Sequence, residues 1–196
     1  MRHFVYFSTK APTSGKFSLD NLAKAGRLDI VIHSIIAGFF LSNDFREDVK
    51  MHLIFYGPPN PPRHIEIQVT NELEISKKDI GNLIKKILYK YKPGFKTEVL
   101  PGCFVEKKSL LKVITELEEQ GKEIFILDKK GENIRKIKIP EESVFILGDH
   151  EGLPKKELKR LKQIANPVSV GPKVYFASQV VSVINNELDI REFISQ

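Results

Sequence analysis

The sequence has one cysteine, Cys103, among its 196 residues, and it has no tryptophan. A single thiol excludes an intrachain disulfide framework, and it also excludes a zinc module built from several cysteines. Chains of this kind are typical of reducing compartments. We therefore expect a cytoplasmic protein.

Long apolar runs are also missing. The longest, residues 30–41, is interrupted by His33 and Ser34 and is shorter than the roughly 20 apolar residues that a membrane-spanning helix needs. The first segment, MRHFVYFST, alternates like a strand and lacks the apolar centre of a signal peptide. We therefore expect no membrane segment.

The residues that are present fit one globular domain. Hydrophobic residues make up 41% of the chain and charged residues 29%, which excludes a disordered or fibrous class. A chain of 196 residues is long enough for one sizeable core. The net charge of +6 and the pI near 9.2 favour a polyanionic partner, although solvated lysines explain the same values.

The apolar periodicity indicates an α/β fold with a mostly parallel sheet and helices on both of its faces. In the second half of the chain, fully apolar strands alternate with helices, which is typical of a parallel sheet covered on both sides. The predicted strands are residues 3–9, 49–57, 64–70, 123–128, 133–139, 144–149 and the segment around Val168; the predicted helices are residues 28–41, 80–91, 110–121, 154–164 and 176–188.

Three of the predicted strand ends carry features of a binding site. The loops that begin at Leu127, Gly148 and Ser169 follow apolar strands, and loops of this kind converge at one edge of a parallel sheet. Glycines in these loops allow a ligand to approach the backbone, because no Cβ is in the way. The chain has neither a G-x-G-x-x-G motif after a strand nor a P-loop, so a dinucleotide or a nucleotide phosphate is not expected.

The second of these loops contains three polar residues in a row, Asp149, His150 and Glu151. Adjacent side chains point in different directions, whereas metal sites take spaced ligands from rigid elements, so we expect no metal here. Two interpretations stay open. Asp149 and His150 stabilise the loop and cap the helix near Pro154, or the backbone of the loop binds a neutral or cationic small molecule.

Several motifs resemble those of a known family. FILGDHEGLP, SVGPKVYFAS and INNELD resemble the last motifs of the SPOUT methyltransferases, which bind S-adenosylmethionine in a knotted α/β domain. AGRLDIV, FFLSNDFREDV, YGPPNPP and the terminal NNELD extend the resemblance over nearly the whole chain. Within the superfamily, they resemble the tRNA pseudouridine-54 N1-methyltransferases of archaea and their bacterial relatives.

The resemblance implies one SPOUT domain over residues 1–196, with a deep trefoil knot within about residues 120–196 and a homodimer packed through the knot helices. Archaeal members carry a cysteine where this chain has Val180 and a histidine where it has Asn185, so a thiol contact to the cofactor does not carry over. The residues implied to line the S-adenosylmethionine pocket are Leu127, Gly148, Val170, Gly171, Pro172, Lys173, Val174, Tyr175 and Val180.

Methylation of pseudouridine at N1 requires loss of a proton, for which a carboxylate is a suitable base. Asp29 is the candidate, because it lies on an otherwise apolar helix; a structural pair with His33 or Arg27 explains it equally well. Arg27 and Arg46 are candidates to hold RNA phosphate or an extruded base, although a surface salt bridge is an alternative for Arg46.

Two further candidates lie in loops. Asn60, within PPNPP, offers a donor and an acceptor to a uracil edge, and a plain turn residue is the alternative. His150 is a candidate to contact substrate. Taken together, the sequence predicts a tRNA pseudouridine N1-methyltransferase that uses S-adenosylmethionine and no metal. A methyltransferase acting on ribosomal RNA and a non-catalytic RNA-binding or assembly factor are the alternatives.

Overall fold

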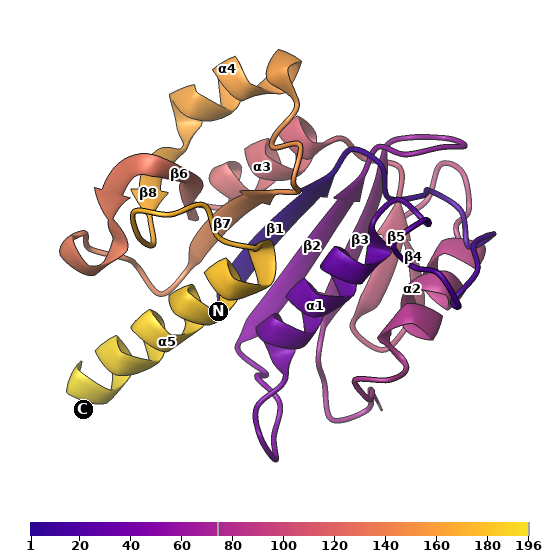
Figure 1. The fold of residues 1–196 in the computed structure, drawn as a ribbon, viewed down its shortest axis with the longest axis horizontal. Coiled ribbons are helices and arrows are strands. Elements are labelled where there is room, and N and C mark those ends of the chain that lie inside the picture. Colours follow the sequence, from indigo (N-terminus) through magenta and orange to yellow (C-terminus); the bar gives the residue numbers. More distant parts are fainter. Residues whose placement is uncertain (74, 196) are drawn as a thin grey trace.

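The computed structural model describes residues 1–73 and 75–195. Its strands form one eight-stranded sheet in the order β4-β5-β3-β2-β1-β7-β6-β8 (Figure 1). The strands are β1 (Arg2–Ser8), β2 (Val49–Phe55), β3 (Arg63–Gln68), β4 (Thr97–Leu100), β5 (Cys103–Glu106), β6 (Glu123–Asn133), β7 (Ser143–Gly148) and β8 (Asn166–Ser169).

The sheet is mostly parallel. Strands β2, β1, β7, β6 and β8 run in the same direction, whereas β3, β5 and β4 pair antiparallel at the other side. Strand β1 lies at the centre between β2 and β7, and all its residues are buried, as expected for a strand covered on both faces. The carboxyl ends of the parallel strands therefore meet along one edge, which we call the carboxyl edge.

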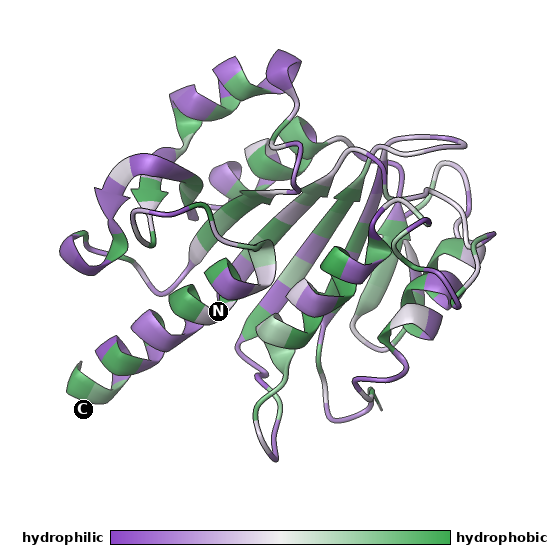
Figure 2. Cartoon of the chain, in the orientation of Figure 1, coloured by the Kyte–Doolittle hydropathy of each residue, from purple (hydrophilic) through white to green (hydrophobic). Residues whose placement is uncertain are grey.

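Helices cover both faces of the sheet. Three of them, α1 (Leu28–Phe39), α2 (Ile80–Tyr89) and α5 (Ala177–Ser195), pack on one apolar core, and α3 (Leu110–Glu119) and α4 (Lys155–Ile164) pack on a second core behind the sheet (Figure 1). In Figure 2 the helices carry both hydrophobic and hydrophilic residues, whereas the central strands are largely hydrophobic. The predicted α/β sheet with helices on both faces is confirmed. Among the described residues, no helix has the length and apolar character needed to cross a bilayer.

Two local predictions were incomplete or wrong. Residues 133–139 are not a strand: β6 ends at Asn133, whose side chain accepts a hydrogen bond from the Arg135 N–H at 3.0 Å and starts a 3-10 turn at Ile134–Lys136. The β4–β5 hairpin was also not predicted from the sequence. Its strands have four residues each, and Gly102 makes the tight connection at φ 75°.

Candidate active site

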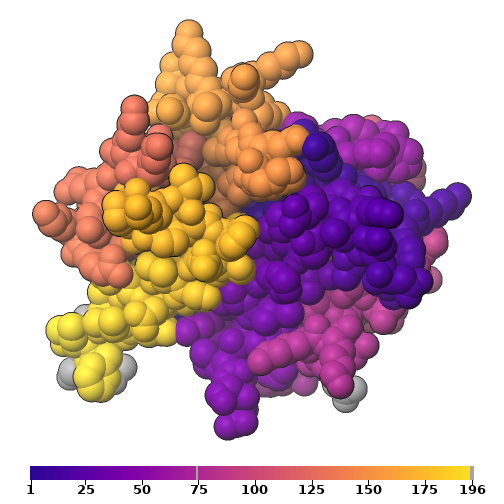
Figure 3. Space-filling view, in the orientation of Figure 1, coloured from indigo at the N-terminus to yellow at the C-terminus, as the bar shows by residue number. Residues whose placement is uncertain are grey.

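A pocket of about 360 Å³ lies at the carboxyl edge, where β6, β7 and β8 end between α4 and the start of α5. Figure 3 shows the orange surface of α4 next to the yellow-orange segment that leads into α5. Most of the predicted cofactor residues line this pocket. They are Leu127, Gly148, Val170, Gly171, Lys173, Val174, Tyr175 and Val180, whereas Pro172 belongs to the same segment but is not among the lining residues.

The walls of the pocket are largely apolar. Leu147 and Val168 are buried beneath it, and Leu127 is half-buried. Two acidic residues, Asp128 and Asp149, and several lysines stand at its border. Such a pocket accepts a molecule with a flat apolar part and a few polar groups, and its volume lies within the range of small-molecule sites.

The pocket glycines hold its loops in place. A Cβ on Gly148 would lie 2.7 Å from the carbonyl carbon of Gly152, and one on Gly171 would lie 2.6 Å from the Tyr175 hydroxyl. Gly152 has φ 80°, which other residues rarely adopt. Gly148 was expected to leave room for a ligand. In the structure it leaves room for the backbone of Gly152, so the loop itself depends on it.

The Asp149–Glu151 cluster does not converge on one point. The Asp149 carboxylate accepts hydrogen bonds from the N–H groups of Thr9 at 2.9 Å and Glu151 at 2.8 Å. Glu151 forms an ion pair with Lys10, and His150 is exposed. Asp149 thus stabilises the loop, as one interpretation predicted, but the capping role is wrong, because Pro154 stands at the start of α4 without a side-chain cap.

One short loop, residues 9–13, connects the other predicted site segments to the pocket. Besides its contacts to Asp149 and Glu151, it packs on two glycines: a Cβ on Gly26 or Gly57 would lie 2.0 or 2.3 Å from the Lys10 carbonyl oxygen. The AGRLD and YGPPNPP motifs are therefore held beside the pocket loop. This connecting role of residues 9–13 was not predicted, because these residues do not form a recognisable motif.

Asp29 lies in the first turn of α1, and its partner is Arg27 and not His33. The Arg27 guanidinium donates two hydrogen bonds to the carboxylate, Nε–Oδ1 and NH2–Oδ2, both at 3.0 Å. These hydrogen bonds lower the pKa of Asp29, so it is ionised at neutral pH. Both side chains remain partly accessible, with 29% of Asp29 and 43% of Arg27 exposed.

Tyr6 lies next to the pocket wall and was not among the predicted residues. It is buried in β1 directly beside Leu147, a pocket residue. Burial raises the pKa of its hydroxyl, and the negative charges of Asp149 and Asp29 raise it further. Both carboxylates therefore lie within electrostatic range of this hydroxyl, which connects Asp29 to the pocket. The alternation of β1 places Tyr6 on the same face as α1, but only the pairing of β1 with β7 brings it next to Leu147.

The remaining candidates lie in different places. Asn60 is exposed at the carboxyl edge after β2; its N–H donates to the Thr13 hydroxyl at 2.9 Å and its Oδ1 accepts from Lys107 at 2.8 Å. Arg46 lies at the opposite edge, before β2, and is paired through both nitrogens with Asp189 on α5 at 2.7 and 2.5 Å. The structure does not bring Arg46 to the pocket, and the salt-bridge interpretation describes its contacts.

Comparison with known proteins gives a consistent result. A family model described as "Putative SAM-dependent RNA methyltransferase" matches residues 1–193. A protein of Methanococcoides burtonii named tRNA (pseudouridine(54)-N(1))-methyltransferase is 36% identical, with 96% of each chain covered. A Vibrio parahaemolyticus protein named "Putative pseudouridine methyltransferase" is 34% identical, with 98% of this chain and 100% of the relative covered.

The fold is also found among solved structures. The crystal structure of Archaeoglobus fulgidus Nep1 bound to S-adenosylhomocysteine superposes with a TM-score of 0.63 at 13% identity, covering 95% of this chain and 96% of the other. At this identity the similarity shows the common fold alone.

Proposed function

The chain belongs to the family of SAM-dependent RNA methyltransferases, and from this we propose that it transfers a methyl group from S-adenosylmethionine to N1 of pseudouridine 54 in tRNA. The observation that carries the proposal is the pocket at the carboxyl edge, with the segment of Arg27 and Asp29 held next to the pocket loop through Lys10. The substrate is proposed from the names of the relatives, and the pocket is the proposed binding site of the cofactor.

The residues of the pocket fit S-adenosylmethionine. Its adenine needs an apolar slot with backbone groups at the rim, which Leu127, Val170 and Tyr175 provide. Val180 lines the wall with an aliphatic side chain and has no thiol, so the cofactor would be held there by packing. When bound, the cofactor supplies an electrophilic methyl group on a sulfonium. The protein excludes water and orients the nucleophile.

Asp29 would accept the N1 proton of the pseudouridine. A carboxylate that receives two hydrogen bonds from a guanidinium is a weak base, because the pairing favours its ionised form. We propose that the substrate takes over the Arg27 guanidinium through a phosphate or a base carbonyl, which leaves the Asp29 carboxylate available. The pair is partly exposed, so both groups are accessible to RNA.

Asn60, after β2, and His150, after β7, would contact the tRNA along the carboxyl edge. Because Lys107 occupies the Asn60 Oδ1, the amide NH₂ is the group that Asn60 offers to a base carbonyl. His150 is exposed at the border of the pocket. A tRNA substrate is consistent with the positive net charge of +6, and we propose that the enzyme acts in the cytoplasm.

We also propose a single SPOUT domain over residues 1–196, with a trefoil knot within about residues 120–196. In support, β1 lies between β2 and β7, so the two halves of the chain share one sheet. After the edge strand β8, the chain returns across β6 and β7 to place α5 against α1 (Figure 1). Such a return is required if α5 is threaded through the preceding loops.

The exposed apolar end of α5 supports a homodimer. Ile190, Phe193 and Ile194 are 46%, 81% and 75% exposed and lie on one side of the helix, which extends beyond the sheet (Figure 2). A second copy of the chain would cover them. Light scattering after gel filtration should give a dimer for the wild type and a monomer for Phe193→Asp, with Phe95→Asp, at another exposed phenylalanine, as the control; a wild-type monomer contradicts the dimer.

The proposed activity is tested with two tRNA transcripts that differ at position 54. We expect calorimetry to detect S-adenosylmethionine and S-adenosylhomocysteine binding, and labelled methyl transfer to a tRNA with pseudouridine 54 but not to one with uridine 54. Transfer to ribosomal RNA alone would favour the first alternative. Absence of cofactor binding would favour a non-catalytic RNA-binding factor.

A further inference from the structure

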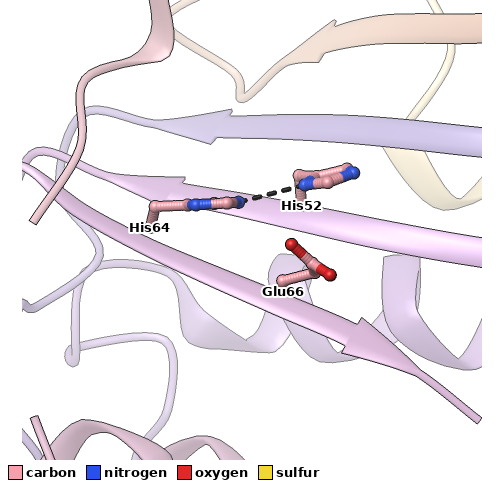
Figure 4. A group of neighbouring side chains, drawn as sticks. All are labelled: His52, His64 and Glu66. Carbon is pink, nitrogen blue, oxygen red and sulfur yellow. Dashed lines mark hydrogen bonds between the residues drawn. The ribbon is translucent and has the colours of Figure 1, made fainter. Parts of the chain in front are cut away.

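A chain of three buried histidines crosses the sheet on the face opposite α1. His3, His52 and His64 come from β1, β2 and β3 and are 3–4% exposed. His3 Nδ1 lies 3.1 Å from His52 Nε2, and His52 Nδ1 lies 3.0 Å from His64 Nε2 (Figure 4). The chain ends at carboxylates: His64 Nδ1 lies 3.0 Å from Glu106, and His3 Nε2 lies 3.9 Å from Glu142.

The tautomers of the three rings decide which of these contacts are hydrogen bonds. Three neutral imidazoles have three N–H groups, and a carboxylate can only accept. If His3 donates to His52, His52 to His64 and His64 to Glu106, all three hydrogen bonds form. His3 Nε2 is then a buried acceptor without a hydrogen-bond partner among the described residues. If His3 instead points its N–H toward Glu142, His52 has one N–H for two contacts, so the contact between His52 and His64 can be given to a cation.

Both arrangements keep the three imidazoles neutral. Neutral imidazoles are the form in which histidine binds metal ions, so the rings of His52 and His64 are available as ligands.

A third ligand lies beside the contact between His52 and His64. The carboxylate of Glu66, from β3, points toward the His52 ring (Figure 4). One ligand atom from each of His52, His64 and Glu66 lies within 4.8 Å of the others. The outer nitrogens of both rings already have partners, Glu106 for His64 and His3 for His52. Metal-binding histidines usually have such partners, which fix the orientation of the ring.

We propose that His52, His64 and Glu66 bind one divalent transition-metal ion of the Zn²⁺ class. Two imidazoles and one carboxylate suit Zn²⁺ in ligand type. The ligands point away from α1, since Met51, Leu53 and Ile65 of the same strands pack on the α1 side. The site is therefore separate from the proposed methyl transfer and would link β2 to β3.

Binding of the metal ion requires no net gain or loss of protons by the three imidazole rings. His52 moves its proton from Nδ1 to Nε2 and donates it to His3, and His3 moves its proton from Nδ1 to Nε2, facing Glu142. The lone pairs of His52 Nδ1 and His64 Nε2 are then free for the ion. Small ring rotations are needed, because these two nitrogens face each other in the metal-free protein.

The route to the site passes two lysines. In the metal-free protein the Glu66 carboxylate is paired with Lys50 at 3.2 Å and Lys96 at 2.8 Å, and these side chains are 24% and 43% exposed. An incoming ion displaces at least one ammonium group. Removal of Lys96 should therefore increase metal affinity, which a merely structural histidine chain does not predict.

The test uses untagged protein, stripped with chelator, and titrated with Zn²⁺ alone or with Co²⁺ as a visible probe. We expect one ion per chain, four-coordinate Co²⁺ absorption bands and a higher melting temperature. Glu66→Gln and His64→Gln should abolish the bands, Glu106→Gln should weaken affinity about 10- to 100-fold, and Lys96→Gln should strengthen it. Controls are His33→Gln and Lys92→Gln, which change an exposed histidine and a neighbouring lysine.

Absence of saturable Zn²⁺ binding to the wild type overturns the proposal. Wild-type affinity in a folded Glu66→Gln variant overturns it as well, because the ion would then bind elsewhere. If His64→Gln fails to fold, Glu66→Gln and Lys96→Gln still test the proposal, since both residues lie at the edge of the buried histidine chain. An increase in affinity for Lys96→Gln but not for Lys92→Gln supports the site.

Discussion

The two edges of the parallel sheet each carry an arginine–aspartate pair with two hydrogen bonds, yet the pairs differ in their surroundings. Arg27–Asp29, at the carboxyl edge, is 43% and 29% exposed and lies beside the pocket loops. Arg46–Asp189, at the amino edge, is 13% and 37% exposed. Asp189 is also bonded to Arg2, which is almost fully buried.

The difference shows which pair is available for function. At the amino edge, Arg2 and Arg46 together hold α5 against the start of β1 and the segment before β2. Removing either partner there breaks a network. At the carboxyl edge the pair joins only two residues of the same helix end, so an RNA group can replace one partner at little structural cost. Identical pair chemistry thus holds distant elements together at one edge and, in the proposed mechanism, is open to the substrate at the other.

The largest effect should come from Asp29→Asn. We expect single-turnover methyl transfer to fall by about 10²–10⁴-fold, because the amide cannot accept the N1 proton. Affinity for S-adenosylmethionine and the melting temperature should stay unchanged, since Asp29 is not a pocket-lining residue. Asp20→Asn, in the exposed loop before α1, is the control. An unchanged transfer rate for Asp29→Asn would remove it as the base.

The next effect concerns the pocket loop at the same edge. Gly148→Ala places a Cβ 2.7 Å from the backbone of Gly152, so the loop must shift. We expect affinity for S-adenosylmethionine to fall about 10- to 100-fold by calorimetry, equivalent to about 1–3 kcal/mol of overpacking. Gly81→Ala on α2 is the control, because its φ is not positive and a Cβ there would meet only the side-chain ends of Leu19 at 3.1 Å and Ile32 at 3.5 Å. Wild-type affinity in Gly148→Ala would contradict the described loop packing.

At the amino edge, Arg46→Met should act on stability and not on binding. We expect a decrease of about 1–2 kcal/mol in the free energy of unfolding, because Asp189 loses two of its hydrogen bonds. Affinity for tRNA should not change. Arg160→Met, an exposed arginine on α4, is the control measured by the same urea titration. Lower tRNA affinity with unchanged stability would restore Arg46 as a substrate residue.

The smallest expected effect is the pH dependence of the stability difference between the wild type and Arg46→Met. Burial alone raises the pKa of Asp189, but hydrogen bonds from Arg46 and Arg2 bring it below the ordinary value of 3.8. A lowered pKa in the folded protein contributes stability above pH 3.8, and this contribution is lost as the pH falls below that value. The stability difference between wild type and Arg46→Met should therefore shrink below pH 3.8. If this stability difference does not change with pH, the effect of Arg46→Met comes from lost packing and not from the charge of Asp189.

Contacts between residues that are close along the chain could be predicted from the sequence, whereas contacts between distant residues could not. The pocket was predictable because each of its loops directly follows an apolar strand, and the motif resemblance added residues such as Tyr175. Arg27 and Asp29 are neighbours, so their pairing was an expected alternative. Arg46 and Asp189 are 143 positions apart, and no local pattern indicates their contact.

The histidine chain and Tyr6 escaped prediction for a related reason. His3, His52 and His64 appear as isolated residues in three separate strands, and they come together only through the strand order β3-β2-β1. Tyr6 lies next to the pocket wall because β1 is placed beside β7, far away in sequence. Long-range strand pairing decides these contacts, and periodicity within one strand does not contain that information.

The central claim is tested most directly by mass spectrometry of tRNA containing pseudouridine 54, digested after incubation with the protein and methyl-labelled S-adenosylmethionine. We expect one labelled methyl group per tRNA, on N1 of pseudouridine 54, and transfer that is slower by about 10²–10⁴-fold with Asp29→Asn under single-turnover conditions. A label on another nucleotide, or no label from a protein that binds the cofactor, would contradict it.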